Sequence, residues 1–145
     1  MQILVDTNIL LRAVQRQHTD SPVAVSALKT LHRQSHQLCL TPQNLIEFWS
    51  VCTRPAPVNG LGYSAAVAAR HVSRFESIFR MLPDSQQIFQ EWKSLVSQHN
   101  VTGASVHDAR LVAAMKLHAV DQVLTFDASG FTRYPGITVI QPKAV

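Results

Sequence analysis

The sequence is poor in cysteine and in charged residues, and it lacks long apolar runs. Its 145 residues include only two cysteines, Cys39 and Cys52, whose separation fits neither a disulfide framework nor a zinc site. We expect two core thiols in a reducing compartment, and therefore a cytoplasmic protein. No apolar run reaches the roughly 18–20 residues that span a bilayer, and no basic stretch precedes the apolar N-terminal residues as in a signal peptide. These absences argue against membrane proteins, secreted disulfide scaffolds and zinc fingers.

The composition is that of one folded domain with an excess of positive charge. Apolar residues make up 46% of the chain, and a chain of this length can bury roughly 68–70% of its unfolded surface. Charged residues are only 15%, against about 25% in typical domains, so the position of each carboxylate is informative. The formal net charge is +4, from 13 Lys and Arg against nine Asp and Glu.

Short apolar segments alternate with segments that have helical character. Strands are expected over residues 3–5, 38–40, 122–125 and 137–140. Helices are expected from residue 8, from residue 22, over 42–51 and from 64 to about 79. After a break at residues 82–85, a further helix is expected to run to about residue 98, and the last one spans 106–118. This alternation predicts a single α/β domain over residues 1–145, with a short-stranded parallel sheet covered by helices on both faces.

Several Ser and Thr residues mark the expected helix starts. Ser21 and Thr41 each precede a proline, which suits the first position of a helix. Ser64 follows a loop that is rich in proline and glycine. Ser105 and Asp108 are spaced like a capping box, although Asp stands where Glu or Gln is usual.

Four carboxylates stand out by their positions. Asp6 and Asp127 follow expected strands, and ligands of parallel sheets bind beyond the carboxyl ends of the strands. Asp108 begins an apolar helix stripe that continues to Met115, and Glu47 lies nearly opposite the apolar stripe of its helix. Position alone leaves an ordinary alternative for each: a helix cap for Asp6 and Asp108, a solvated face for Glu47, and a turn for Asp127.

Four segments spread over most of the chain carry a family resemblance. They are Val5-Asp6-Thr7-Asn8-Ile9-Leu10-Leu11, Asn44-Leu45-Ile46-Glu47-Phe48, Val106-His107-Asp108-Ala109-Arg110-Leu111-Val112-Ala113-Ala114, and Leu124-Thr125-Phe126-Asp127 with Phe131. Through these segments, in this order, the chain resembles the PIN-domain nucleases, especially the VapC-type toxins of bacterial toxin–antitoxin pairs. The opening Asp-Thr-Asn alone is a weak indication, whereas all four segments in order are a strong one.

The resemblance implies a PIN-like fold and a metal-dependent endoribonuclease, the toxin of a toxin–antitoxin pair. The residues it implies as catalytic groups and metal ligands are Asp6, Glu47, Asp108 and Asp127. Asn8 and Thr125 are candidates for holding these ligands in place. Carboxylates without Cys or His ligands suit Mg²⁺ or Mn²⁺ better than zinc. A cognate antitoxin and a homodimer are expected as partners, with residues 64–98 available for either contact.

The charge balance suits a polyanionic substrate. Without the four carboxylates that a metal would offset, 13 positive and five negative charges remain, which is a balance of +8. Such a protein attracts nucleic acid at long range. Arg12, Arg54 and Arg110 are the candidate substrate-binding residues, and Arg16 and Lys116 are further basic residues near the expected site. RNA rather than DNA is implied by the resemblance alone.

Two other functions remain open. A phosphohydrolase with an Asp nucleophile after the first strand typically carries a second Asp two residues on, where this chain has Asn8. A non-catalytic PIN-like module would bind RNA or protein through its basic surface. No Ser–His–Asp order, Gly-x-Ser-x-Gly elbow or phosphate-binding glycine loop supports any further class of enzyme.

Overall fold

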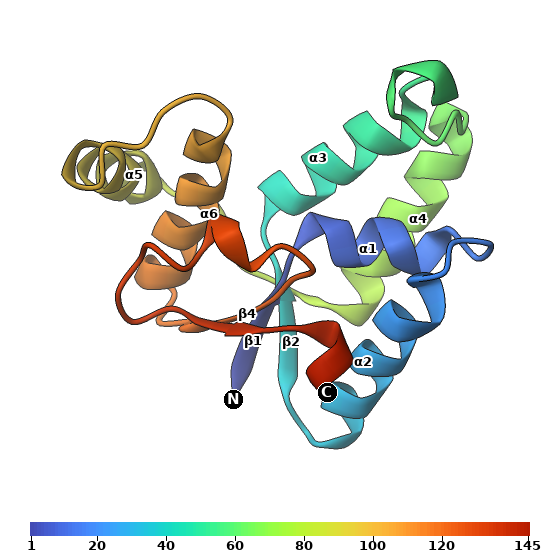
Figure 1. Cartoon of the computed structure of the whole chain (residues 1–145), viewed down its shortest axis with the longest axis horizontal. Helices are drawn as coiled ribbons and strands as arrows, with labels where there is room; N and C mark the ends of the chain where they lie inside the picture. The colour runs from blue at the N-terminus through green and yellow to red at the C-terminus, as the bar shows by residue number, and fades with distance from the viewer.

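Five short parallel strands lie at the centre of the computed structural model, which describes residues 1–145 (Figure 1). They are β1 (Gln2–Val5), β2 (Gln37–Leu40), β3 (Arg80–Met81), β4 (Gln122–Leu124) and β5 (Thr138–Ile140). Their order across the sheet is β3-β2-β1-β4-β5. The chain builds outward from β1 through β2 to β3 and then continues on the other side with β4. The strand order therefore reverses between β1 and β4.

Four of the five strands agree with the prediction, and β3 is the strand that the sequence pattern does not indicate. β3 has only two residues, Arg80 and Met81, which pair with Cys39 and Leu40 of β2. The Leu82 N–H extends this pairing by donating to the Leu40 carbonyl at 2.8 Å. A two-residue strand has no alternation to detect, so β3 depends on its place beside β2.

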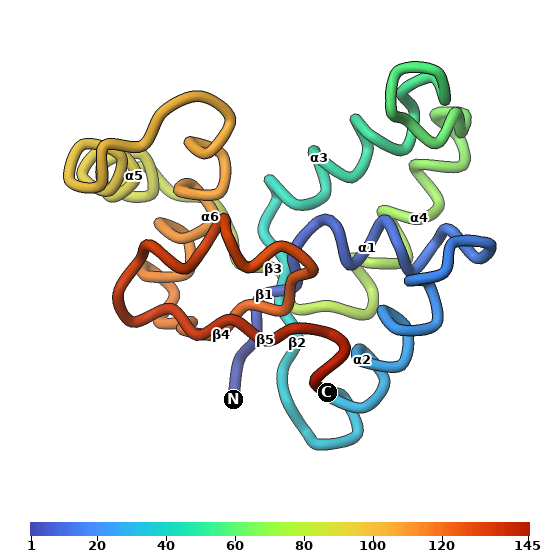
Figure 2. The backbone as a smooth tube through the Cα atoms, viewed as in Figure 1, coloured from blue at the N-terminus to red at the C-terminus, as the bar shows by residue number.

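Six α-helices connect and follow the strands. They are α1 (Thr7–Val14), α2 (Ser21–Arg33), α3 (Pro42–Thr53), α4 (Ala65–Ile78), α5 (Gln86–Gln98) and α6 (Ser105–Leu117). Three short 3₁₀ turns span Ala56–Val58, Ala128–Gly130 and Pro142–Ala144. The last of these turns packs against α2, as the backbone trace shows (Figure 2). Each predicted helix is present within a few residues of its expected position.

Two helices begin as the cap residues predict. At α3, the Thr41 hydroxyl accepts from the Asn44 N–H and the Asn44 side chain accepts from the Thr41 N–H, so the pair forms a capping box. At α4, the Ser64 side chain accepts from the Val67 N–H at 3.2 Å. Both caps satisfy amides that the first helical turn leaves without partners.

Two predicted caps are wrong. Helix α2 already includes Ser21, and Asp20 occupies its cap position without a side-chain cap bond. Helix α6 likewise includes Ser105, with Ala104 at the cap position. The predicted capping box between Ser105 and Asp108 does not form, because both residues lie inside the helix. The Asp108 carboxylate is consequently not committed to capping.

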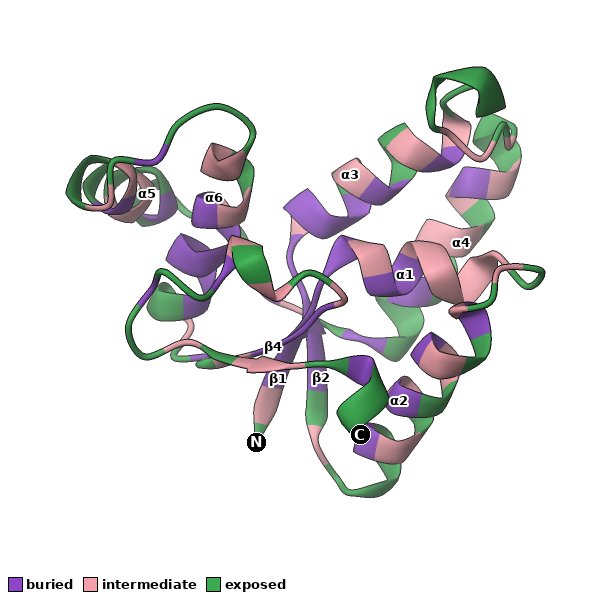
Figure 3. Cartoon of the chain, in the orientation of Figure 1, coloured by how far each residue is buried: buried purple, intermediate pink, exposed green.

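Successive residues of the strands belong to two separate cores, and Figure 3 shows the central strands as largely buried. Ile3 and Val5 of β1 pack with α1, α2, α3 and α4, whereas Leu4 between them packs with α5 and α6. All three side chains are fully buried. Because adjacent strand residues point to opposite faces, helices cover both faces of the sheet, and the predicted α/β architecture is confirmed.

The apolar residues predicted to pack below Asp108 are buried, and so are both cysteines. Leu111, Val112 and Met115 of α6 are at most 1% exposed, so the apolar stripe below Asp108 faces the core. Cys39 and Cys52 are both buried and unpaired. None of the helices combines the length and the apolar character that crossing a membrane requires.

Candidate functional site

The reversal of strand order brings Asp6 and Asp127 to one edge of the sheet. Asp6 follows β1 directly and caps α1, with its Oδ1 accepting from the Thr7 N–H at 2.8 Å. The Asp6 N–H donates to the Leu124 carbonyl at 3.0 Å, which ties the end of β1 to the end of β4. Asp127 caps the 3₁₀ turn that follows β4. This crevice is where open α/β sheets bind their ligands.

The Thr125 hydroxyl connects these two segments. It donates to Asp6 Oδ2 at 2.7 Å and accepts from Asn8 Nδ2 at 3.1 Å and from the Asp127 N–H at 3.0 Å. Asn8 Oδ1 in turn accepts from the Phe126 N–H at 3.2 Å. Asn8 therefore supports Asp6 through Thr125 and does not contact the carboxylate by a hydrogen bond of its own.

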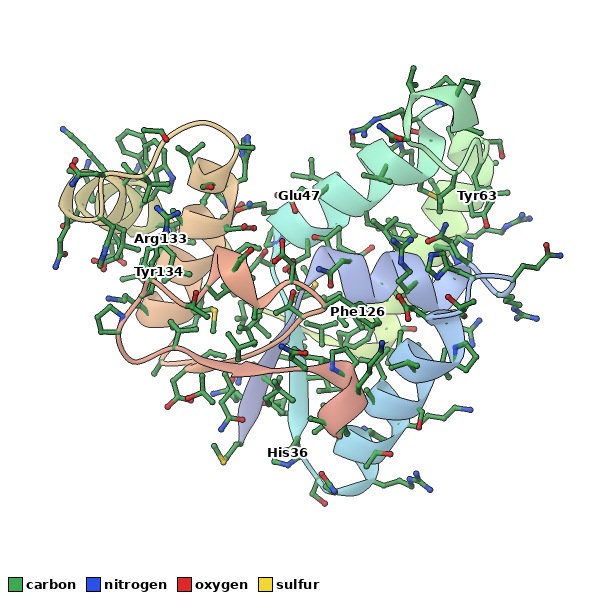
Figure 4. All side chains as sticks on the ribbon, in the orientation of Figure 1. His36, Glu47, Tyr63, Phe126, Arg133 and Tyr134 are labelled. Atoms are coloured by element: carbon green, nitrogen blue, oxygen red, sulfur yellow. The ribbon has the colours of Figure 1, made fainter.

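Glu47 lies on the side of α3 that faces α6 (Figure 4). Its Oε2 accepts from Thr7 Oγ1 at 2.9 Å, and its Oε1 accepts from Gln43 Nε2 at 2.8 Å. Thr7 Oγ1 also accepts from the buried Asn44 Nδ2 at 3.2 Å. The polar side of α3 is thus packed against α1 over this stretch, so the solvated-face alternative for Glu47 is wrong.

Asp108 occupies the opposite wall, half-buried in the first turn of α6. The backbone of Gly130 passes directly beneath its carboxylate, and a Cβ atom at position 130 would collide with Asp108 Oδ2. A side chain at position 130 would therefore require the Asp108 carboxylate to move from this position. The turn after β4 therefore contributes both a carboxylate, Asp127, and the space that Asp108 occupies.

The four acidic side chains line one pocket with a volume of about 410 Å³. No lysine or arginine lines it. The lining residues are Asp6, Thr7, Asn8, Leu11, Glu47, Val51, His107, Asp108 and Asp127. Carboxylates from four separate segments of the chain thus share one concave surface.

Burial and repulsion raise the pKa of two of these carboxyls. Asp6 is 7% exposed. Burial raises its pKa to about 6, with smaller upward contributions from Glu47 and Asp127, although two hydrogen bonds act in the opposite direction. Burial also raises the pKa of Asp108 to about 7, helped by the charges of the other three acids and opposed by Arg133. A bound cation would relieve this repulsion.

The oxygen-only donor set is the one that Mg²⁺ and Mn²⁺ prefer. No three His, Cys, Asp or Glu side chains are grouped closely enough in the structure to hold a metal ion as they stand. The carboxylates line the pocket walls and do not meet at one point. Each oxygen of Asp6 and Glu47 accepts one hydrogen bond and keeps a further lone pair. The chemistry of the donors fits a hard divalent ion.

The three candidate substrate-binding arginines lie outside the lining of this pocket. Arg12 donates to Gln15 at 2.6 Å. Arg54 is exposed at the end of α3. Arg110 donates to Gln43 at 3.1 Å and forms a 3.3 Å ion pair with Asp84. Arg110 is therefore engaged in protein contacts.

Three residues around the pocket were not indicated by the sequence. Gln43 donates to Glu47, and Gly130 lies against Asp108. Arg133, which is exposed and labelled in Figure 4, carries a charge that opposes the rise in the pKa of Asp108. Gln43 stands four residues before Glu47, and this helical spacing could have indicated their contact. Nothing in the local sequence distinguishes Arg133 from other surface arginines.

A family model described as PIN domain matches residues 3–137. The fold is also similar to solved toxin–antitoxin proteins along almost the whole chain. VapBC-1 from nontypeable Haemophilus influenzae superposes with a TM-score of 0.70 at 12% identity, covering 98% of each chain. VapBC2 from Rickettsia felis, bound to a promoter DNA fragment, gives 0.69 at 14% identity, covering 97% of this chain and 98% of that chain.

The third similar structure is VapC20 of Mycobacterium tuberculosis, described as a toxin that cleaves the sarcin–ricin loop. It superposes with a TM-score of 0.67 at 17% identity, covering 90% of this chain and 94% of that chain. No curated protein sequence matches this chain. At these identities the structural similarity concerns the fold.

Removing the Asp108 charge should stabilise the metal-free protein above neutral pH. A carboxyl whose pKa is raised on folding keeps its proton where the unfolded chain has lost it, so stability falls as the pH rises from about 4 to about 7. With allowance for the partial exposure of Asp108, we expect D108N to raise the free energy of unfolding at pH 8 by about 2 kcal/mol. Urea unfolding in the presence of a chelator, at pH 5 and pH 8, measures this change.

The matched control is D121N, because Asp121 is exposed and lies outside the pocket. In D121N, the free energy of unfolding should differ between pH 5 and pH 8 by the same amount as in the wild type. A D108N protein that is less stable than the wild type at pH 8 would contradict the assigned electrostatics.

Proposed function

Since this chain belongs to the PIN-domain family, we propose that it is a metal-dependent endoribonuclease and the toxin of a toxin–antitoxin pair. The observation that carries this proposal is the shared pocket, which gathers four carboxylates at the point where the strand order reverses. Its two buried free thiols are consistent with a place in the reducing cytoplasm.

In this proposal the four pocket carboxylates hold Mg²⁺ or Mn²⁺. They are Asp6, Glu47, Asp108 and Asp127. Such an ion neutralises charge on the phosphoryl oxygens and lowers the pKa of an attacking water. The protein orients the carboxylates: Thr7 and Thr125 hold Asp6, Thr7 and Gln43 hold Glu47, and Gly130 leaves the space for Asp108.

The proposed substrate is RNA. The balance of +8 outside the pocket attracts a polyanion, and the similar fold of VapC20 belongs to a protein described as cleaving the sarcin–ricin loop. Asn8 argues against a phosphohydrolase with an Asp nucleophile, because an enzyme of that kind would have a second acid at this position. The Asn8 amide is instead bonded to the Thr125 hydroxyl and to the Phe126 N–H.

Loss of a pocket carboxylate should abolish metal-dependent RNA cleavage. The D6N and D108N variants each remove a ligand charge, which we expect to lower the cleavage rate at least about a hundredfold. The measurement is cleavage of a mixed single-stranded RNA pool with Mg²⁺, with Mn²⁺ and with chelator. The control variant is D121N, which should cleave at the wild-type rate.

Cleavage that persists in D108N, or in chelator, would refute the assigned site. RNA binding by the wild type without cleavage under any condition, and unchanged in D108N, would favour the non-catalytic module instead.

A groove between α2 and α4 is the proposed docking site for the antitoxin. It has a volume of about 1050 Å³, and residues at the end of α1 and the start of β2 complete its lining. Its apolar lining includes Val25, Leu28 and Phe75, and no acidic residue lines it. We call it the basic groove, after its basic lining residues Arg16, Lys29, His32, His36, His71, Arg74 and Arg80.

The chemistry of the basic groove fits a segment that carries both acidic and apolar side chains. His36 adds an unpartnered buried Nδ1 atom that such a segment could engage. The similar structures include a toxin–antitoxin complex from Klebsiella pneumoniae, so an antitoxin is the partner we assign to this groove. Charge pairing of this kind steers association and depends on salt.

Reversing charge inside the basic groove should weaken antitoxin binding. K29E and R74E place negative charge against the expected acidic segment, and we expect each to weaken binding about tenfold or more. We expect a toxin–antitoxin pair to encode a small protein immediately upstream, and that protein is the probe, titrated by calorimetry at low and high salt. The controls are R33E and R70E, on the same two helices but outside the groove lining. Equal losses in all four variants would contradict the assigned groove.

A separate apolar surface on α3 is the proposed homodimer contact. Ile46 is 69% exposed and Trp49 is 37% exposed. They border a shallow hollow of about 400 Å³ whose other lining residues are Leu45, Ser50 and Val72. This α3 patch has no charged lining residue, so a second copy of the same patch suits it better than an acidic antitoxin.

Placing a charge in the α3 patch should break the dimer. We expect I46E to be monomeric, because pairing two patches would bury two unpaired carboxylates. Light scattering coupled to size-exclusion chromatography measures the mass over a range of protein concentrations. V58E is the control, because Val58 is 54% exposed but lies in the loop after α3. A monomeric wild type, or a dimeric I46E protein, would overturn this assignment.

A further inference from the structure

Gln43 joins the two walls of the acidic pocket. It lies in the first turn of α3 and is 8% exposed. Its Nε2 donates to Glu47 Oε1 on the same helix at 2.8 Å and to the His107 carbonyl of α6 at 2.8 Å. Its Oε1 accepts from Arg110 Nη1, also of α6, at 3.1 Å. One side chain is thus bonded to both helices, which face each other across the pocket (Figure 1).

The contacts of Gln43 match a primary amide and no other side chain. Two acceptors, Glu47 Oε1 and the His107 carbonyl, use the two N–H groups, and one donor, the Arg110 guanidinium, uses the oxygen. Glutamate could not donate, leucine could do neither, and asparagine is shorter by one methylene. Arg110 is itself held by the 3.3 Å ion pair with Asp84, so a connected network runs from the surface to Glu47.

From this geometry we infer that Gln43 is a positioning residue for the metal site. It fixes Glu47 Oε1, and its bonds to the His107 carbonyl and to Arg110 of α6 hold its own amide in place. The inference rests on the proposed function, in which Glu47 and Asp108 bind a divalent ion from opposite walls. Without the Gln43 amide, Glu47 keeps one hydrogen bond, from Thr7, and is free to rotate about it.

This role makes Gln43 act through Glu47, which distinguishes it from a residue that only satisfies buried polar groups. If Gln43 positions Glu47, then Gln43→Leu should matter only while the Glu47 carboxylate is present. If it is only a structural contact between α3 and α6, its loss should weaken metal binding equally with and without that carboxylate. A double-mutant cycle separates the two cases.

The experiment is Mn²⁺ binding to the RNA-free protein, followed by electron paramagnetic resonance of free Mn²⁺. We expect Q43L to weaken binding about tenfold to a hundredfold, as outer contacts of metal ligands do. In the E47Q background, Q43L should produce no further loss. The matched control is Q90L, because Gln90 is exposed on α5, and its affinity should equal that of the wild type.

The outcomes separate this inference from the proposed function. A wild type that binds no Mn²⁺, or an E47Q variant that binds it as the wild type does, would remove the assigned metal site itself. If E47Q weakens binding and Q43L does not, the metal site stands and the role of Gln43 is refuted. Equal losses from Q43L in both backgrounds also refute it.

A second measurement needs no substitution at Gln43. In the wild type, the side-chain amide protons of Gln43 should exchange with solvent more slowly than those of exposed Gln90, and their NMR resonances should shift when Mg²⁺ is added. The same resonances should shift in E47Q. Exchange as fast as at Gln90, or resonances that ignore both Mg²⁺ and E47Q, would overturn the inference.

Discussion

The location of the acidic pocket depends on the pairing of β1 with β4. Their register places Val5 opposite Leu124, and the Asp6 N–H continues the ladder to the Leu124 carbonyl at 3.0 Å. Because the two strands end at the same level, Asp6 and Thr125 meet at 2.7 Å although 119 positions separate them. A slip of one residue would exchange the two faces of β1 and turn Ile3 and Val5 away from their core. The two cores therefore hold the register, and the register holds the first carboxylate.

The helices that cover the sheet supply the remaining walls of the pocket and part of its electrostatic balance. Asp6 caps α1 and Asp108 lies in the first turn of α6, where the helix dipole favours negative charge. These placements and the hydrogen bonds to Asp6 and Glu47 counter part of the repulsion between the acids. They do not cancel the combined effect of burial and of this repulsion, which raises the pKa of Asp6 to about 6 and that of Asp108 to about 7. The pocket is thus assembled against an electrostatic cost that the surrounding packing offsets.

The sequence predicts the architecture well because its strands are short, apolar and separated by capped helices. It does not predict β3, which has two residues and exists only through its pairing with β2. Misplaced caps at Ser21 and Ser105 have a similar origin, since one more helical residue changes the role of each serine without changing the local pattern. The positions of Asp6 and Asp127 after strands indicate a site by sheet geometry alone. Contacts such as those of Gln43 and Gly130 depend on how α6 packs against α3 and the turn after β4, and no local pattern encodes that packing.

The way the pocket is held together bears on what it can bind. No lysine or arginine lines it, and the nearby guanidinium of Arg110 is paired with Asp84. Neutral groups, the hydroxyls of Thr7 and Thr125 and the amide of Gln43, orient the carboxylates of Asp6 and Glu47. A basic side chain in their place would neutralise the carboxylates and compete with a bound cation. Hydroxyl and amide donors position the oxygens and leave most of their charge in place, which is the requirement for a site that takes its positive charge from an external ion.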